Sequence, residues 1–224
     1  LMNLIGQAQR DVLIISPYFV PGPRMMAVYE QLRKRGVRLR VLTNSLASND
    51  APAAHAGYAR YRGRMLGIGA ELYEMHSDPQ MSNLLGTGSG SGSRRPGSSG
   101  FSLGSGAGGS KAGATSRASL HSKAVIIDGR LAVIGSMNLD LRSQLQNSEV
   151  ALVLRSTVLA QQATRQVENT FATGAYRVEQ RDGKLYWRAP PNAMFPDATS
   201  EPGASTKLKL TVMIIGPLAP DEML

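Results

Sequence analysis

The sequence predicts an α/β domain in which strands and helices alternate and pack in layers. Short runs of aliphatic and β-branched residues recur along the chain, and the segments between them carry apolar residues at helical spacing. With 224 residues and 42% hydrophobic content, the chain is long enough for one sizeable core. We therefore expect one domain with appendages.

Composition narrows the classes of partner and of site. Lys and Arg number 25 against 16 acidic residues, which gives a formal charge of +9. Such a surface attracts phosphates, nucleic acid or an acidic bilayer, and charge alone does not choose among them. The chain has no Cys, which excludes disulfides and thiolate metal sites. It also lacks the roughly 18 to 20 consecutive apolar residues that a membrane-spanning helix needs.

The first part of the chain is predicted to alternate between strand and helix. Residues 11–19, "DVLIISPYF", are expected to contain a strand that Pro17 ends, and residues 24–36 to form a helix. Residues 37–45 form the next predicted strand, followed by a helix over 53–66 and a strand over 70–74. Polar and aromatic residues at strand ends are expected to line the functional crevice. They are Tyr18, Phe19, Thr43 and Asn44.

The second part begins with a segment of different composition. Residues 86–118 are mostly Gly and Ser with scattered basic side chains, which predicts a flexible insertion, either a plain surface loop or a basic lid. A hairpin, a strand over 148–156 and a helix over 159–171 follow. A second hairpin is expected to turn at Asp182 and Gly183. The catalytic domain is predicted to span residues 1–189, and residues 190–224 form a tail.

The hairpin "SLHSKAVIIDGRLAVIGSMN", residues 119–138, carries the chemistry. Because side chains two apart in a strand share a face, His121 and Lys123 are expected to point together. Asp128 and Gly129 favour a two-residue turn, and that register places His121 opposite Ser136. The strand then leaves the sheet toward Asn138.

These four side chains suit a phosphodiester. The imidazole of His121 can attack phosphorus or protonate the leaving oxygen, while Lys123, Ser136 and Asn138 donate to non-bridging oxygens. This chemistry requires no metal and no other cofactor. The parity of Asp128 and its position in the turn give it a supporting role. A strand cap at His121 and a solvated Lys123 are the alternative for an isolated His-x-Lys pair.

The spacing His-x-Lys, four residues, Asp, then Gly-Ser-x-Asn matches the signature of the phospholipase D superfamily. Further stretches resemble the C-terminal half of bacterial cardiolipin synthases. They are "ISPYFVPG", "GVRLRVLTNSLASND", "HAGYARYR", "ELYE" and "NLDLRSQLQNSEV", with "SRASLHSK" leading into the motif. The resemblance covers most of residues 11–187 and leaves the Gly/Ser segment unmatched.

The resemblance implies a phospholipase D-like mixed β-sheet sandwiched between α-helices, with two copies of the motif meeting at one active site. One His forms a phosphohistidine, and His121, in the second motif, serves as general acid and then base. His121, Lys123 and Asp128 are the catalytic residues that the motif implies. Ser136 and Asn138 would hold phosphate oxygens, and Glu149 matches an acidic position that supports a catalytic His. An ordinary exposed carboxylate is the alternative for Glu149.

Other matched residues have weaker roles. Arg142 and Ser143 match an "RS" that braces the loop after Asn138, although a solvated Arg is the alternative. Tyr18 and Asn44 match positions at the pocket rim, where core packing or strand termination would also explain them. The two remaining histidines have no motif support and are expected to be surface or helix residues. They are His55 and His76.

The sequence contains one motif where the family uses two. The partner His is expected from a missing N-terminal half or from a second copy of this chain, and truncation is the favoured explanation. The resemblance then implies a phosphatidyltransferase that moves a phosphatidyl group onto phosphatidylglycerol. A phospholipase D-type hydrolase or nuclease is the alternative, and a non-catalytic module that binds lipid or nucleic acid is a third reading.

The tail offers a route to lipid. Residues 207–218, "KLKLTVMIIGPL", place two lysines before a short apolar run, which is typical of an interfacial anchor on anionic lipid. The alternative is a terminal segment docked on its own domain. We therefore expect the protein to be membrane-associated and peripheral, on the bacterial inner membrane.

Overall fold

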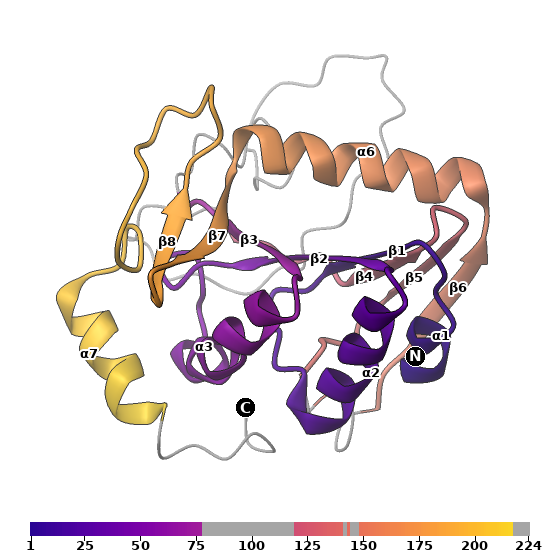
Figure 1. Cartoon of the computed structure of the whole chain (residues 1–224), viewed down its shortest axis with the longest axis horizontal. Helices are drawn as coiled ribbons and strands as arrows, with labels where there is room; N and C mark the ends of the chain where they lie inside the picture. The colour runs from indigo at the N-terminus through magenta and orange to yellow at the C-terminus, as the bar shows by residue number, and fades with distance from the viewer. Residues whose placement is uncertain (78–118, 141–142, 144–147, 217–224) are drawn as a thin grey trace.

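The computed structural model describes residues 1–77, 119–140, 143 and 148–216. In these residues the chain forms an eight-stranded mixed sheet with helices on both faces (Figure 1). The predicted α/β fold with a mixed sheet between helices is thereby confirmed. The segment predicted as a flexible insertion, residues 86–118, lies outside the described residues.

The strands run in the spatial order β6-β5-β4-β1-β2-β3-β7-β8. Their bounds are Asp11–Ile15 (β1), Arg38–Asn44 (β2), Glu71–Met75 (β3), Ala124–Ile127 (β4), Leu131–Gly135 (β5), Ala151–Arg155 (β6), Ala175–Arg181 (β7) and Lys184–Arg188 (β8). The helices are Met2–Gly6 (α1), Gly22–Lys34 (α2), Pro52–Gly67 (α3), Thr157–Thr173 (α6) and Thr206–Ile215 (α7).

Strand direction gathers the loops at one edge of the sheet. β1, β2 and β3 are parallel, while β4 is antiparallel to β1 and β5 to β4. The ends of β1, β2 and β5 therefore meet the start of β4. We call this the site edge, and it consists of residues 16–20, 44–50, 119–123 and 136–140.

Alternate residues of the strands face two separate cores. Val12, Ile14 and Leu39 pack toward α1, α2 and α3, whereas Leu13 and Ile126 pack toward α6 (Figure 1). All five side chains are almost completely buried. Because the central strands are covered on both faces, they are continuous apolar runs, which is why the sequence predicted them well.

The two Asp-Gly turns differ. Arg181 pairs with Lys184, so Asp182 and Gly183 form the two-residue turn that the sequence predicted. At the first hairpin Ile127 pairs with Leu131, which leaves a three-residue connection. The predicted two-residue turn at Asp128 and Gly129, which would pair Ile127 with Arg130, is therefore wrong.

The connection between β4 and β5 is longer than predicted because Asp128 is hydrogen-bonded to β1. The backbone N–H of Asp128 donates to the carbonyl of Asp11 at 2.8 Å, which extends the β1–β4 ladder by one residue. The side chain of Asp128 also accepts hydrogen bonds from the N–H groups of Gln9, Arg10 and Asp11. Asp128 therefore belongs to the ladder with β1, and the turn closes one residue later than predicted.

His55 is a helix residue, one of the two predicted alternatives, and it is not at the surface. His55 lies on α3 but is 1% exposed, in a buried cluster with Arg62, Glu74 and Glu201. Arg62 contacts Glu74 at 3.1 Å and Glu201 at 2.8 Å. Burial alone would raise the pKa of Glu201, but the hydrogen bond from His55 and the charge of Arg62 lower it to about 2. Glu201 belongs to the tail that follows residue 189, so these contacts attach the tail to α3.

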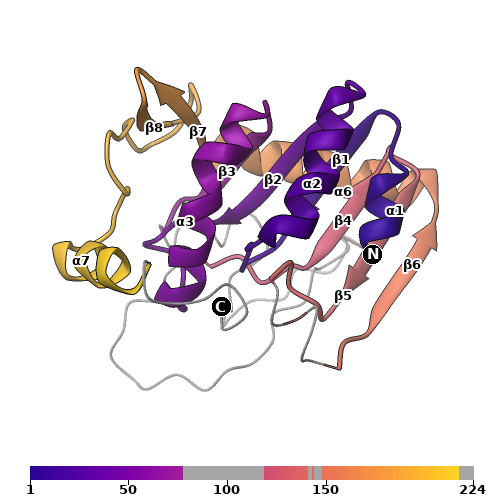
Figure 2. The same ribbon diagram turned by 60° about the horizontal axis from the view of Figure 1, so that its bottom comes forward.

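The described part of the tail continues along the same side. Ala198 pairs with Trp187, and His76 stacks on Phe195 with ring centroids 4.0 Å apart. Near the start of α7, Gly203 lies against Ala47 and Ser77, two residues that follow strand ends. Figure 2 shows α7 beside α3, at the side of the sheet toward which β1 and β2 point. Within the described ranges, none of the helices is long and apolar enough to cross a membrane.

Candidate active site

The segment that leads into the motif is anchored by Asn44. The Oδ1 of Asn44 accepts from the N–H of Leu120 at 2.8 Å, and its Nδ2 donates to the carbonyl of Leu120 at 3.2 Å. Asn44 is 1% exposed, and Ser48 donates to the same Oδ1. The amide thus pairs with the backbone as a neighbouring strand would. It positions residues 119–120 immediately before His121.

His121 and Lys123 lie on an extended segment just before β4. The imidazole of His121 is exposed, and within the described residues no hydrogen bond is made by its ring. The carbonyl of His121 accepts from the Nζ of Lys123 at 3.2 Å. The Lys123 ammonium therefore lies against the backbone at His121. An exposed imidazole at the site edge is available to an incoming phosphodiester.

Ser136 and Glu149 face each other across the β5–β6 pair. The hydroxyl of Ser136 donates to Oε2 of Glu149, and the N–H of Ser136 donates to the carbonyl of Val150 at 3.0 Å. The N–H of Gly135 donates to the carbonyl of Lys123 at 3.2 Å. Continuing this register places Ser136 opposite Ser122 and not opposite His121, as the predicted turn had it. Because directly opposed residues share a face, this register puts Ser136 on the face of Ser122 and not on that of His121 and Lys123, so the predicted convergence on one face is wrong.

Gly135 makes the close approach of these strands possible. A Cβ at Gly135 would lie 2.3 Å from the carbonyl oxygen of Val150 and 2.9 Å from the Cα of Ala151. Real side chains essentially never approach backbone atoms so closely. Sequence analysis treated Gly135 only as part of the motif spacing. Its steric role is invisible until β6 is placed beside it.

The loop after β5 is tied to the loop after β1. The N–H of Leu139 donates to Oγ of Ser16 at 3.1 Å, and the N–H of Val20 donates to the carbonyl of Leu139 at 2.8 Å. Between these anchors, the Oδ1 of Asn138 is buried and has no hydrogen-bond partner in the part of the chain that the structure describes. Asp140 accepts from the N–H of Ser143 at 2.6 Å. Arg142 lies outside the described residues.

The charges of three carboxylates act on the Lys123 ammonium. Burial lowers the pKa of Lys123, while the charges of Glu149, Asp140 and Asp50 act in the opposite direction. Tyr18 donates to Asp50 at 2.5 Å, and burial together with this hydrogen bond raises the pKa of Tyr18. Asp50 and Asp140 were not singled out by sequence analysis, because only the fold places their loops beside the motif.

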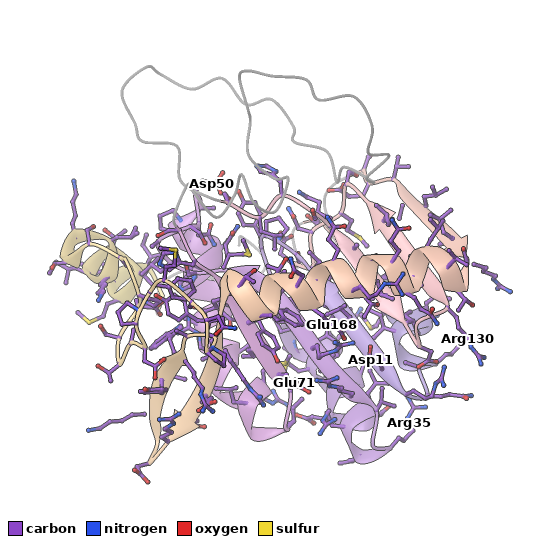
Figure 3. All side chains as sticks on the ribbon, turned by 90° about the horizontal axis from the view of Figure 1, so that it is seen from above. Asp11, Arg35, Asp50, Glu71, Arg130 and Glu168 are labelled. Atoms are coloured by element: carbon purple, nitrogen blue, oxygen red, sulfur yellow. The ribbon has the colours of Figure 1, made fainter. Side chains whose placement is uncertain are left out.

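Asp128 does not lie near His121 and Lys123. It lies at the opposite end of β4, and at about 3.3 Å per residue roughly 17 Å of strand separates it from Lys123. Burial would raise the pKa of Asp128, but hydrogen bonds from the N–H groups of Asp11, Arg10 and Gln9 lower it. Figure 3 shows the two edges, with Asp50 at one and Asp11 and Arg130 toward the other. Asp128 thus fastens β4 to the start of β1.

The arrangement can bind a phosphate and move a proton. Lys123 supplies a cation and Ser136 a hydroxyl, on the edge where His121 presents an imidazole. The described residues contain no group of three or more His, Asp or Glu side chains that could hold a metal ion. Donors fixed by backbone anchors need little rearrangement when charge builds on the phosphoryl oxygens.

The sequence of this chain is similar to those of known proteins. The sequence model of the family described as "Cardiolipin synthase, PLD-like domain" matches residues 1–85 and 103–171. Cardiolipin synthase C of Escherichia coli is 35% identical over 188 residues, which are 84% of this chain and 35% of that protein. An uncharacterised protein of Helicobacter pylori is 27% identical over 206 residues, 92% of this chain and 36% of its own. The chain therefore spans about a third of the length of these relatives.

Solved structures share the fold. The phospholipase D family member Nuc of Salmonella typhimurium superposes with a TM-score of 0.52 at 17% identity, over 79% of this chain and 88% of Nuc. NucT of Helicobacter pylori gives 0.50 at 14% identity, over 75% and 82% of the two chains. The motif, the mixed sheet and the extent of the family match lead to one assignment. The chain belongs to the phospholipase D superfamily.

Proposed function

We propose that this chain supplies one motif of a cardiolipin synthase-like phosphatidyltransferase, which moves a phosphatidyl group onto a hydroxyl of phosphatidylglycerol. The observation that supports this most directly is the match of the cardiolipin synthase family over residues 1–85 and 103–171, with His121 and Lys123 inside it. The cation at Lys123 and the exposed imidazole at His121 are the groups that such a transfer needs.

In the proposed reaction, the His of the other motif, which this chain does not supply, attacks phosphorus and forms a phosphorus–nitrogen bond. The phosphorus–oxygen bond to the leaving alcohol breaks, and His121 donates a proton to that oxygen. His121 then takes a proton from the hydroxyl of phosphatidylglycerol, whose oxygen attacks phosphorus and breaks the phosphorus–nitrogen bond. Lys123, Ser136 and the amide of Asn138 hold the non-bridging oxygens in both steps.

The other motif must come from outside the residues described here. The relatives are about three times as long as the matched region, which agrees with a second half of the same polypeptide. Nuc, by contrast, is covered to 88% by this chain, so a family member can be about as short as this chain, and a second copy would then have to supply the other motif. We propose the first arrangement. Co-purification of a differently tagged second copy that restores activity to a His121→Ala chain would instead support the second.

Product analysis tests the proposed transfer. The full-length gene product is incubated with phosphatidylglycerol vesicles, beside a His121→Ala version, and the lipids are separated. Cardiolipin from the first protein and not from the second is the expected result. Phosphatidic acid without cardiolipin would show that the protein is a hydrolase and not a transferase. If the protein turns over no lipid but cleaves nucleic acid, it is a nuclease and not a transferase.

We also propose that α7 carries the protein to anionic lipid as a peripheral anchor. Leu210, Met213 and Ile214 are 51%, 67% and 56% exposed, and Lys207 and Lys209 precede them. Because Gly203 lies against Ala47, α7 begins near the site edge, so insertion of its apolar face would bring that edge to the headgroups.

Vesicle sedimentation tests this anchor. Charge reversal at Lys207 and Lys209 is expected to weaken binding to vesicles that contain phosphatidylglycerol by roughly tenfold or more, at about 1 kcal/mol per basic residue near the surface. The same reversal at Lys184 and Arg181, in the β7–β8 hairpin, is the control and should leave binding unchanged. Equal loss in both variants would contradict a specific role for α7.

A further inference from the structure

An open groove lies on the face of the sheet that α6 covers, beside the C-terminal end of that helix. The last turns of α6, the start of β7 and the end of β8 border it, and its cavity volume is about 450 Å³. The chain after β8 rises on the same side of the sheet as α6, and Pro190 and Pro191 line the groove together with Phe171 (Figure 1). A cavity of this volume is within the range of small-molecule sites.

Two of the arginines that line the groove are neutralised by carboxylates. Arg40 is 4% exposed and pairs with Asp11 at 2.7 Å and with Glu168 at 2.8 Å. These two carboxylates lie close together in Figure 3. Arg38 donates to both carboxylate oxygens of Glu71, at 2.6 and 2.9 Å. The pairs fix one end of the groove and leave little charge there for a ligand.

Arg177 and Arg188 carry the charge that is left. They are directly opposed in the β7–β8 pair, so they share a face, and both line the groove. In the part of the chain that the structure describes, Arg177 makes no ion pair, and Arg188 meets only Glu179, at 3.5 Å. The same carboxylate is held by Arg181 at 2.7 Å. Like charges in directly opposed positions destabilise a sheet, and an anion between the two guanidinium groups would remove that repulsion.

Flat apolar side chains lie beside these arginines. Tyr73 is directly opposed to Arg177 across the β3–β7 pair, and its ring stacks on Phe171 with centroids 3.7 Å apart and planes inclined by 14°. The rings of Pro190 and Pro191 also line the groove. Nucleobases stack on aromatic side chains, and the planar fork of an arginine matches a pair of phosphate oxygens. The groove therefore offers a place for a planar ring next to a place for a phosphate.

We infer that the groove binds a nucleotide, with its phosphate between Arg177 and Arg188 and its base against Phe171 and the two prolines. The inference does not depend on the proposed function. β7 is four strands from β4 in the sheet, so roughly 19 Å separates Arg177 from the segment of Lys123. A free nucleotide and the end of a nucleic acid strand present the same phosphate and ring, and both are sources of this ligand.

Calorimetric titration of the full-length protein measures the binding. The ligands are AMP, ribose 5-phosphate, adenosine and inorganic phosphate. AMP should bind roughly fivefold or more tightly than ribose 5-phosphate, because its base stacks, and roughly tenfold or more tightly than adenosine, which has no phosphate. A short oligodeoxythymidylate compared with dTMP distinguishes the sources. Tighter binding of the oligomer would support a strand as the ligand, and equal binding would support a free nucleotide.

Removal of the two arginines tests their role. Arg177→Gln combined with Arg188→Gln should weaken AMP binding by roughly tenfold or more, because charged hydrogen bonds to the phosphate are lost. Arg130→Gln combined with Arg155→Gln is the matched control, since it removes the same charge. Both control arginines are exposed, lie toward the opposite end of the sheet and make no ion pair within the described ranges. The control should bind AMP like wild type.

Ala172→Glu tests the groove while every arginine is retained. Ala172 lines the groove at an exposed position of α6, so a carboxylate there should repel the phosphate and weaken AMP binding severalfold. Gln161→Glu adds the same charge at an exposed position near the start of α6 and should leave binding unchanged. Lys123→Gln, which removes the cation of the motif, should leave it unchanged as well.

Several results would overturn the inference. Equal weakening in the Arg177/Arg188 and Arg130/Arg155 variants would show that net charge alone attracts the ligand. Loss of AMP binding in Lys123→Gln would place the phosphate at the motif. Equal affinity for AMP and ribose 5-phosphate would show that no base is bound, and no binding of AMP or the oligomer at millimolar concentration would show that the arginines are solvated. Because these titrations involve no lipid turnover, they stand or fall separately from the proposed phosphatidyltransferase.

Discussion

The side chain of Asn44 pairs with the backbone of Leu120 through two hydrogen bonds, of 2.8 Å to the N–H and 3.2 Å to the carbonyl. This pair joins the end of β2 to the segment that carries His121. Its two partners lie 76 positions apart in the chain, with the Gly/Ser segment between them. The motif is therefore held in place by a residue that belongs to a different part of the sequence.

Replacement of Asn44 tests this anchor. Asn44→Ala leaves buried backbone groups without partners, so the free energy of unfolding should fall by about 1–3 kcal/mol. Activity per folded molecule should fall as well, because residues 119–123 lose their anchor. Urea unfolding measures the effect on stability, and turnover of the soluble diester bis(4-nitrophenyl) phosphate measures the effect on activity. Asn169→Ala, at an exposed position of α6, should change stability by less than about 0.5 kcal/mol.

Gly135 should not tolerate a methyl group. Gly135→Ala places a Cβ 2.3 Å from the carbonyl of Val150, so β6 must move away and the contact between Ser136 and Glu149 must open. We expect a loss of about 1–3 kcal/mol of stability, as for other overpacked sites, together with loss of activity. Gly63→Ala, in α3 with open space around it, is the control and should stabilise by up to about 1 kcal/mol. Unchanged activity in Gly135→Ala would refute the steric argument.

Asp128 should affect stability and not turnover. Its pKa is lowered in the folded state, so the stabilisation is present above the unfolded pKa and is lost as the pH falls through the folded value. Asp128→Asn should therefore unfold more easily than wild type at pH 7, by about 1–2 kcal/mol for lost bonds to a charged acceptor, and the difference should shrink in acid. The midpoints of urea unfolding of wild type and Asp128→Asn, at pH 7 and in acid, measure this difference in stability. A large fall in kcat with unchanged stability would instead place Asp128 in the chemistry.

Replacement of Glu149 should shift the alkaline limb of the pH–rate profile to lower pH. Burial lowers the pKa of Lys123 and the charge of Glu149 opposes that effect. Glu149→Gln removes the opposing charge, so the pKa of Lys123 falls further and activity should be lost at a lower pH than in wild type. Glu168→Gln, which removes a carboxylate paired with Arg40 away from the site edge, should leave the limb in place. A limb that stays or moves upward in Glu149→Gln would contradict the coupling.

The sequence predicts the strands and helices better than it predicts the register in which they pair. The central strands are apolar runs, and helices such as Gly22–Lys34 carry a clear stripe, so local pattern is sufficient to place them. The two Asp-Gly pairs show the limit. Asp182 and Gly183 follow the local preference, whereas Asp128 is drawn into the ladder with β1 by three backbone N–H groups.

Burial of charge is likewise decided by tertiary structure. Sequence analysis expected His55 to be a surface or helix residue because no motif includes it. In the structure Glu74, Arg62 and Glu201 converge from a strand, a helix and the tail, and their mutual charges make the buried histidine position possible. Gly135 is similar, because its need for glycine comes from β6 and not from its own neighbours in the chain.

The central claim is that His121 acts as the general acid that protonates the leaving alcohol. The most direct measurement compares wild type and His121→Ala on two substrates, one with a glycerol leaving group and one with 4-nitrophenolate, which leaves without protonation. With a proton donor removed, kcat on the first should fall by roughly 10²–10⁴-fold and on the second by far less. Equal losses on both substrates, or no loss on either, would contradict this role for His121.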